Sequence, residues 1–130
     1  MNQLIKISTY SFKIIQKFTE ITINLYDNNI FIGTIIYEFI DNLKTFIHDT
    51  RIKNTIFISR LEILTEHINK GYGTILMNFV LDSIKKYNLP VYINVMPIGK
   101  IKSLNYLINY YQQFGFMIIN KSKYNCEMIL

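Results

Sequence analysis

The sequence contains a single cysteine, Cys126, and only two histidines among its 130 residues. One thiol cannot form an intramolecular disulfide, and it cannot supply the cysteine pairs of a structural zinc site. No segment is both long and uncharged enough to cross a membrane as a helix. The first residues also lack the charged start, apolar run and cleavage site of a secretory signal peptide. We therefore expect no metal and no membrane partner, and a reducing, cytoplasmic location.

Charged residues are few, at 18%, whereas half of the residues are hydrophobic. This balance predicts a folded chain, and the length suits one domain covering residues 1–130. The formal net charge of +5 favours an anionic partner such as a phosphorylated cofactor or nucleic acid. The lysines are scattered along the chain and form no run, so a codon bias that raises Lys, Asn, Ile and Tyr together explains them equally well.

Hydrophobic periodicity predicts a mixed α/β order, with strands first and then alternating strands and helices. Residues 4–8 and 12–18 are read as one or two strands, with a small helix as the alternative for the second segment. The other predicted strands cover residues 20–27, 30–40, 55–64, 91–96, 116–119 and 126–130. Predicted helices cover residues 74–87 and 103–114, and residues 41–54 are expected to form a long polar loop.

One stretch combines an apolar strand, a glycine-containing loop and the start of an amphipathic helix. The loop reads Lys70-Gly71-Tyr72-Gly73-Thr74. A strand that passes through a tight loop into a helix directs backbone N–H groups and the positive end of the helix dipole at one point. Glycines let the backbone adopt positive φ angles and approach a ligand closely. The stretch therefore predicts a binding site for an anion.

Three phosphate-binding patterns were compared with this loop. A Walker loop requires four residues between its first glycine and Gly-Lys-Ser/Thr, which the sequence does not offer. A dinucleotide fingerprint requires a third glycine, where the sequence has Leu76. The loop instead resembles the acetyl-CoA-binding motif of the GNAT family of N-acetyltransferases, Gln/Arg-x-x-Gly-x-Gly/Ala, with Gly71 and Gly73 at the glycine positions. Ile68 departs from the motif, since the family usually has Gln or Arg there.

A second segment supports the resemblance. Tyr111-Gln112-Gln113-Phe114-Gly115-Phe116 is similar to the family's Tyr-x-x-x-Gly-Phe element, and a predicted strand separates the two motifs as in the family. The resemblance covers about residues 30–130. It implies an acyl-CoA N-acyltransferase fold, a mixed central sheet flanked by helices. The N-terminal region is abbreviated, because there is little room for the two helices that commonly follow the first strand.

The resemblance implies transfer of an acetyl group from acetyl-CoA to a primary amine within a ternary complex. It places the diphosphate over the glycine loop and the pantetheine arm along the strand before it. The implied cofactor-binding residues are Ile63, Leu64, Thr65, Lys70, Gly71, Tyr72, Gly73, Thr74 and Tyr111. The acceptor is a small-molecule amine or a protein amine. Pairing of protomers through the apolar C-terminal strand predicts a homodimer.

Two side chains are the expected catalytic groups. By its place in the motif, Tyr111 is expected to donate a proton to the departing thiolate of CoA. Glu62, on the strand beside the cofactor, is expected to take the proton of the incoming ammonium group. Glu38, Glu66 and His67 remain alternatives for this base. Each of these residues is also explained by an ordinary surface or packing role.

Two other functions remain open. Ile68 and the short N-terminal region are also what we expect of a CoA-binding module with weak or no catalytic activity. The basic charge and the tyrosines allow a nucleic-acid-binding protein, although the sequence has no basic stripe with interleaved aromatic residues. Nucleic acid is therefore the least expected partner.

Overall fold

A computed structural model of the chain describes residues 2–44, 51–97 and 102–130. In these residues the strands are β1 (Asn2–Ile7), β2 (Tyr10–Lys17), β3 (Glu20–Asp27), β4 (Ile30–Lys44), β5 (Arg51–Ile63), β6 (Val91–Val95), β7 (Met117–Lys121) and β8 (Cys126–Ile129). The α-helices are α1 (Tyr72–Ile84) and α2 (Leu104–Gln112), and two single 3₁₀ turns cover Thr65–His67 and Lys85–Tyr87. No helix in the described part is long and apolar enough to span a bilayer.

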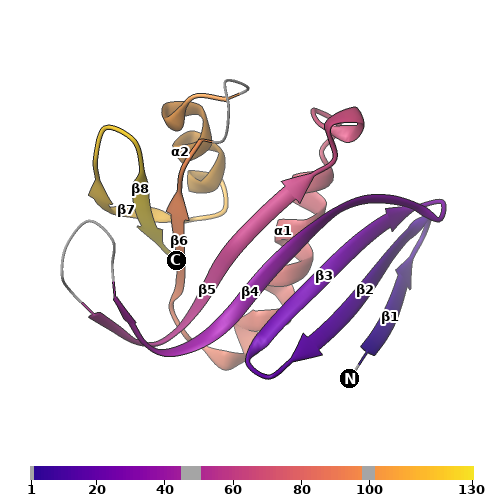
Figure 1. The fold of residues 1–130 in the computed structure, drawn as a ribbon, viewed down its shortest axis with the longest axis horizontal. Coiled ribbons are helices and arrows are strands. Elements are labelled where there is room, and N and C mark those ends of the chain that lie inside the picture. The colour runs from indigo at the N-terminus through magenta and orange to yellow at the C-terminus, as the bar shows by residue number, and fades with distance from the viewer. Residues whose placement is uncertain (1, 45–50, 98–101) are drawn as a thin grey trace. The chain divides into compact units, whose positions relative to one another are not determined.

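The strands form one mixed sheet in the order β1-β2-β3-β4-β5-β6-β8-β7 (Figure 1). This confirms the predicted fold class, a mixed sheet accompanied by helices. The chain groups into two compact units, which we describe separately. Unit 1 comprises Met1–Phe39 and Ile58–Asn88, and unit 2 comprises Ile40–Phe57 and Leu89–Leu130.

Unit 1 begins with an antiparallel meander of β1, β2, β3 and the first part of β4. Alternating apolar and polar residues produce it, since Ile21, Ile23 and Leu25 are buried along one face of β3. Asn28 and Asn29 have positive φ angles of 49° and 68°, which a tight hairpin turn between β3 and β4 requires. Residues 4–8 and 12–18 therefore form two strands, and the helix considered for the second segment does not form.

The connection between β2 and β3 is a short turn. β2 ends at Lys17, β3 begins at Glu20, and Phe18 adopts a positive φ of 57° between them. No helix follows β2, because the paired register runs from Tyr10↔Asp27 to Lys17↔Glu20 without a break. The expected shortening of the N-terminal region is thus present in the fold.

Helix α1 packs on the strands of unit 1. Its Leu76, Met77, Val80 and Ile84 are buried, which is the amphipathic spacing seen in the sequence. Phe79 stacks on Phe12 of β2 with ring centroids 4.0 Å apart and an angle of 4° between the rings. Figure 1 shows α1 running along one face of these strands. Each fully buried side chain of this kind contributes about 1.5–3 kcal/mol to folding.

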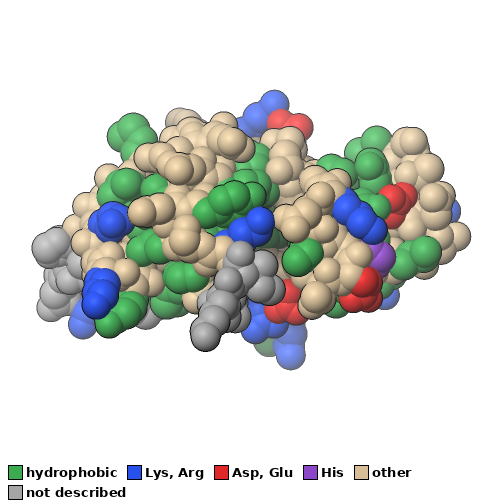
Figure 2. Space-filling view, turned by 90° about the horizontal axis from the view of Figure 1, so that it is seen from above, with side chains coloured by type: hydrophobic (Ala, Val, Ile, Leu, Met, Phe, Trp, Pro, Cys, Tyr) green, Lys and Arg blue, Asp and Glu red, His purple; other side chains and the backbone are tan. Residues whose placement is uncertain are grey.

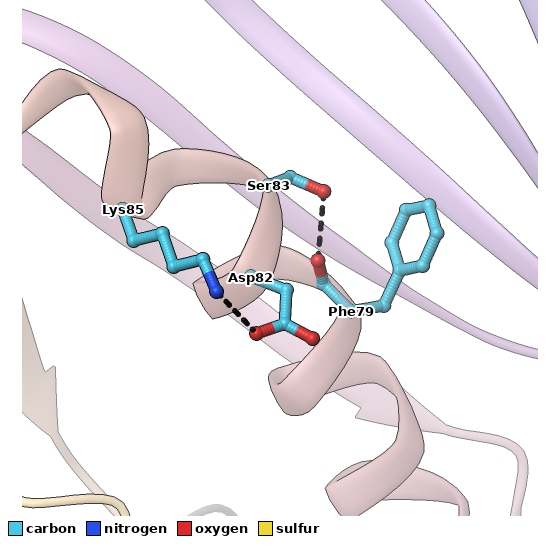
Figure 3. Close-up of polar contacts among 4 residues, drawn as sticks. All are labelled: Phe79, Asp82, Ser83 and Lys85. Carbon is cyan, nitrogen blue, oxygen red and sulfur yellow. Dashed lines mark hydrogen bonds and ion pairs between the residues drawn. The ribbon is translucent and has the colours of Figure 1, made fainter.

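The outer face of α1 is polar. The Ser83 hydroxyl donates a hydrogen bond of 2.7 Å to the carbonyl of Phe79, and Asp82 forms an ion pair of 3.6 Å with Lys85 (Figure 3). The side chains of Asp82 and Lys85 are 80% and 77% exposed, so their pairing contributes little to stability. The helix runs into the turn Lys85–Tyr87, and Asn88 stops it with a φ of 52°.

Unit 2 contains the remaining part of the sheet. β5 pairs in parallel with β6 through Ile56↔Val91 and Phe57↔Tyr92, as expected for two strands joined by a helix. β8 pairs antiparallel with both β6 and β7. The buried Glu127 of β8 accepts a hydrogen bond from the buried Tyr92 hydroxyl of β6. Cys126 beside it is also fully buried and packs as a small apolar side chain.

Helix α2 lies within the predicted range 103–114 and is bounded by Ser103 and by a glycine. The Ser103 hydroxyl accepts a hydrogen bond of 3.1 Å from the Tyr106 N–H and caps the helix. Gly115 follows the helix with a φ of 99°, where a Cβ atom would lie 2.9 Å from Leu130 Cδ1. A glycine is therefore required here by both conformation and space.

Two expectations about the strands were wrong. Residues 41–54 do not form one loop, because β4 continues to Lys44 and β5 begins at Arg51; residues 45–50 lie outside the described residues. Leu43 near the end of β4 is buried, so this part of the strand has an apolar side chain in the protein interior although its neighbours are polar. The C-terminal strand β8 lies between β6 and β7 and is not a sheet edge. The strands at the two edges are β1 and β7.

Candidate functional site

The loop before α1 is held in a conformation that requires its glycine. Asn69 has a φ of 62° and Gly71 a φ of 82°, and Gly71 is the last residue before the helix. No heavy atom lies within 4 Å of the position of a Gly71 Cβ atom. Gly71 is therefore needed for its backbone angles and not for lack of space. The same open space leaves room for a ligand to approach the backbone.

The N-cap residue of α1 is Gly71, which has no side chain that could cap the helix. The first helical hydrogen bond runs over 3.2 Å from the Ile75 N–H to the Gly71 carbonyl. The N–H groups of Tyr72 and Gly73 precede this bond and have no acceptor inside the helix. In the part of the chain that the structure describes, no side chain caps this end and no acidic residue lies in its first turn. The arrangement suits an anion, because the positive end of the dipole is not neutralised.

The side chain of Tyr72 is held by residues other than those of the helix N-terminus. Its hydroxyl donates a hydrogen bond of 2.7 Å to Oδ2 of Asp27, the last residue of β3. Its ring meets Tyr10 and His67 edge-on, with centroids 6.4 Å and 6.2 Å away. The neighbouring Thr9 side chain and the hydrogen bond from Tyr72 lower the pKa of Asp27, and the bond to Asp27 raises the pKa of Tyr72. No local pattern indicates this contact, because Asp27 and Tyr72 are far apart in the chain.

The strand before the loop is backed closely by β4. A Cβ atom on Gly33 would overlap the Glu62 carbonyl and lie 2.8 Å from Ile63 Cδ1. The backbones of β4 and β5 therefore approach each other too closely at Gly33 for any larger residue. Leu64 is fully engaged, since its N–H donates to the Ile32 carbonyl over 2.9 Å and its carbonyl accepts from the His67 N–H over 2.8 Å.

The backbone of Ile63 points the other way. Successive residues of a strand direct their N–H and C=O groups to opposite edges. Because the Leu64 N–H bonds to β4, the N–H and C=O groups of Ile63 lie on the edge of β5 away from β4. The side chains of Glu62 and Thr65 are exposed, so both are accessible to solvent.

Tyr111 lies on α2 in unit 2. Its ring meets Tyr110 and Phe116 edge-on at 5.2 Å and 6.1 Å. Burial, and to a lesser extent Tyr110, raises the pKa of Tyr111 to about 12. Its hydroxyl has no hydrogen-bond partner within residues 2–44, 51–97 and 102–130. The phenol therefore keeps its proton at neutral pH.

The predicted site residues thus fall into two groups. Those from Glu62 to Thr74 belong to unit 1, where the structure brings β5, the loop and the helix N-terminus together. Tyr111 belongs to unit 2. Among the alternative bases, Glu66 and His67 lie in the turn before the loop, and Glu38 lies on β4 opposite Glu20. His48 and Asp49, in the segment that was expected to form a polar loop, lie outside the described residues.

Comparison with known proteins identifies the family. The sequence profile of the Acetyltransferase (GNAT) family matches residues 6–116. The chain belongs to this family. The match begins well before residue 30, so the first strands of the GNAT fold are included. No match was found among curated protein sequences.

Solved GNAT structures share the fold. PaiA N-acetyltransferase from Thermoplasma acidophilum, solved in complex with coenzyme A, aligns with a TM-score of 0.61 at 17% identity, over 85% of this chain and 60% of its own. Campylobacter jejuni N-acetyltransferase PseH aligns with a TM-score of 0.59 at 19% identity, over 88% and 70% of the two chains.

A third structure was solved with a compound that mimics both substrates. It is an Arabidopsis thaliana protein in complex with the bisubstrate analogue CoA-Ac-MVNAL, and it aligns with a TM-score of 0.57 at 25% identity over 83% of this chain and 70% of its own. This GNAT chain spans about three fifths of the length of PaiA.

Proposed function

We propose that this GNAT protein binds acetyl-CoA and transfers its acetyl group to a primary amine. The observation that carries the proposal is the N-terminus of α1, whose N-cap residue is Gly71 with a φ of 82° and no capping side chain. The family membership and the coenzyme A bound to PaiA support this reading. A diphosphate fits the site, because it offers backbone N–H groups, a helix dipole and open space in one place.

The loop and the strand before it hold the cofactor in this proposal. Lys70 and the residues Gly71 to Thr74 contact the diphosphate, with Lys70 supplying a positive charge where Ile68 replaces the usual Gln or Arg. Ile63 binds the pantetheine arm through the backbone groups on its edge of β5. Leu64 contributes only its side chain, since its backbone groups already have partners. Thr65 continues this surface with an exposed side chain.

Tyr111 is the proposed general acid. Acetyl-CoA supplies the acetyl group as a thioester, and a thiolate must be protonated as it departs. A phenol whose pKa is raised to about 12 is fully protonated at neutral pH, and its hydroxyl is not engaged by another described residue. Tyr111 therefore holds a proton at the atom that would donate it.

Glu62 is the proposed general base. An amine is a nucleophile only after its ammonium form loses a proton. The carboxylate of Glu62 is exposed on β5 next to Ile63, so it can accept this proton directly or through a water molecule. Glu66 and His67 are the alternatives, since they precede the loop by only a few residues.

The proposal is tested first by binding and then by turnover. Isothermal titration with acetyl-CoA and CoA should show binding, and absence of binding to either would reject the proposal. Release of free CoA should then be measured with a panel of diamines, amino sugars and peptides. Tyr111→Phe should lower turnover by about 10²–10⁴-fold with little effect on CoA affinity, as should Glu62→Gln. An unchanged rate in either variant would remove that residue from its role.

A CoA-binding module without turnover is the second candidate. Ile68 favours it, because an apolar side chain stands where the family usually has a polar one. The direct turn between β2 and β3 favours it too, since the helices that commonly shape the acceptor side are missing. CoA binding in calorimetry together with no CoA release on the whole amine panel would support this function over the first.

Two partners follow from these alternatives. A homodimer, if it forms by strand pairing, uses β1 or β7 and not β8. Sedimentation measurements would test this state. A nucleic-acid partner has less support, because Lys and Arg side chains occur separately on the face shown in Figure 2 and are not gathered in one stripe.

A further inference from the structure

We propose that Asp27 is a positioning residue, which fixes the diphosphate-binding loop by holding the hydroxyl of Tyr72. This inference rests on the proposed function, because it concerns the loop that would bind acetyl-CoA. It adds a residue from a distant hairpin that lies outside the glycine motif. The contact that carries it is the hydrogen bond of 2.7 Å from the Tyr72 hydroxyl to Asp27 Oδ2.

Tyr72 is the residue through which the loop can be controlled. It lies between the two glycines and is the first residue of α1, so its backbone orientation sets that of the first helical turn. Glycines on both sides give the backbone unusual freedom. Without a side-chain anchor, the binding N–H groups would sample many orientations, and binding would have to order them at a cost in free energy.

Asp27 is well placed to provide this anchor. It ends β3 and pairs with Tyr10 on one side and Ile30 on the other, so its backbone is held by two neighbouring strands. The turn that follows is tied down as well, because the Asn28 N–H donates a hydrogen bond of 3.0 Å to the Thr9 carbonyl. The carboxylate therefore stands on a rigid hairpin, whereas the loop that it holds is not itself part of the sheet.

The Tyr72 ring is constrained in addition to its hydroxyl. Tyr10 and His67 contact it edge-on at 90° and 88°. The ring contacts fix the position of the Tyr72 ring, and the hydrogen bond to Asp27 fixes the position of its hydroxyl group. Removal of the hydroxyl alone should therefore loosen the loop without removing the ring from its place.

Four variants test the role of the hydrogen bond by calorimetric titration with acetyl-CoA. Tyr72→Phe and Asp27→Ala should each weaken binding by about three- to tenfold, as expected for loss of one charge-assisted hydrogen bond. The double variant should bind no more weakly than either single one, because both remove the same contact. Asp27→Asn should keep most of the affinity, since its amide oxygen still accepts from Tyr72.

A matched control separates positioning from general stability. Thr34→Val removes another side-chain hydrogen bond of unit 1, from Thr34 Oγ1 to the Ile23 carbonyl over 3.2 Å, away from the loop. It should lower the melting temperature without changing the affinity for acetyl-CoA. If Asp27→Ala does not fold, Tyr72→Phe still decides the question, because it keeps the ring and its contacts.

The outcomes distinguish this inference from the proposed function. Wild-type protein that fails to bind acetyl-CoA would reject the proposed function itself. Wild-type protein that binds, with Tyr72→Phe binding equally well, would reject the role of Asp27 alone. Losses that multiply in the double variant would also reject it, since the two residues would then act independently.

Discussion

Gly71 carries the strongest requirement of any single residue in the loop. Its φ of 82° lies in the left-handed region, where a Cβ atom costs about 1–2 kcal/mol. We therefore expect Gly71→Ala to lower the free energy of unfolding by about that amount and to weaken acetyl-CoA binding. Urea denaturation and calorimetric titration would measure the two effects.

Gly73 provides the control for this substitution. It lies within α1 and has no positive φ, so alanine there should leave stability unchanged or raise it by up to about 1 kcal/mol. A Cβ atom at Gly73 would still stand at the binding end of the helix and should reduce affinity. Equal destabilisation by both substitutions would contradict the assigned conformations.

Ionisation of the Asp27 carboxylate should make the free energy of unfolding depend on pH. Its pKa is lowered in the folded state from an ordinary 3.8, first by Thr9 and then by Tyr72. Its contribution is therefore present above about pH 4 and is lost as the pH falls through the lower folded value. Urea midpoints measured between about pH 7 and pH 3 should fall more steeply for the wild type than for Asp27→Asn. Parallel curves would show that the carboxylate is not involved.

The stability of helix α2 should depend on its N-terminal cap, Ser103. Ser103→Ala removes the acceptor of the Tyr106 N–H and should lower the free energy of unfolding by about 1 kcal/mol. Asn109→Ala, in the exposed interior of the same helix, should have an effect within about 0.5 kcal/mol or stabilise it. A cap variant as stable as this control would show that the hydroxyl has no capping role. Both are measured by chemical denaturation.

Segments with a strong hydrophobic periodicity were predicted as the right type of element, whereas the ends of some of these elements were not predicted. The alternation from Glu20 to Asp27 is that of a strand with one buried face, and β3 has those bounds. The polar residues after Ile40 resemble a loop locally, but β4 continues to Lys44. Pairing with a neighbouring strand can keep a polar segment extended, and the residues of the segment alone do not indicate that partner strand.

The molecule as a whole should be stabilised by its ligand. If acetyl-CoA binds the folded chain and not the unfolded one, it should raise the free energy of unfolding by about 2.7 kcal/mol at about a hundred times its dissociation constant. Thermal unfolding at increasing acetyl-CoA concentrations would measure this. Gly71→Ala should shift the concentration dependence to higher ligand, whereas Thr34→Val should not. A melting temperature that does not respond to the ligand would contradict the proposed binding.

The local features of this protein follow from residue order alone. The glycine loop before a helix and the strands with one apolar face were predictable, because each depends on neighbouring residues. The contact between Asp27 and Tyr72, the hydrogen-bonded backbone of Leu64 and the place of β8 inside the sheet became visible in the folded chain. These contacts join residues distant in sequence, and such partners are set by how the strands pair and not by any local pattern.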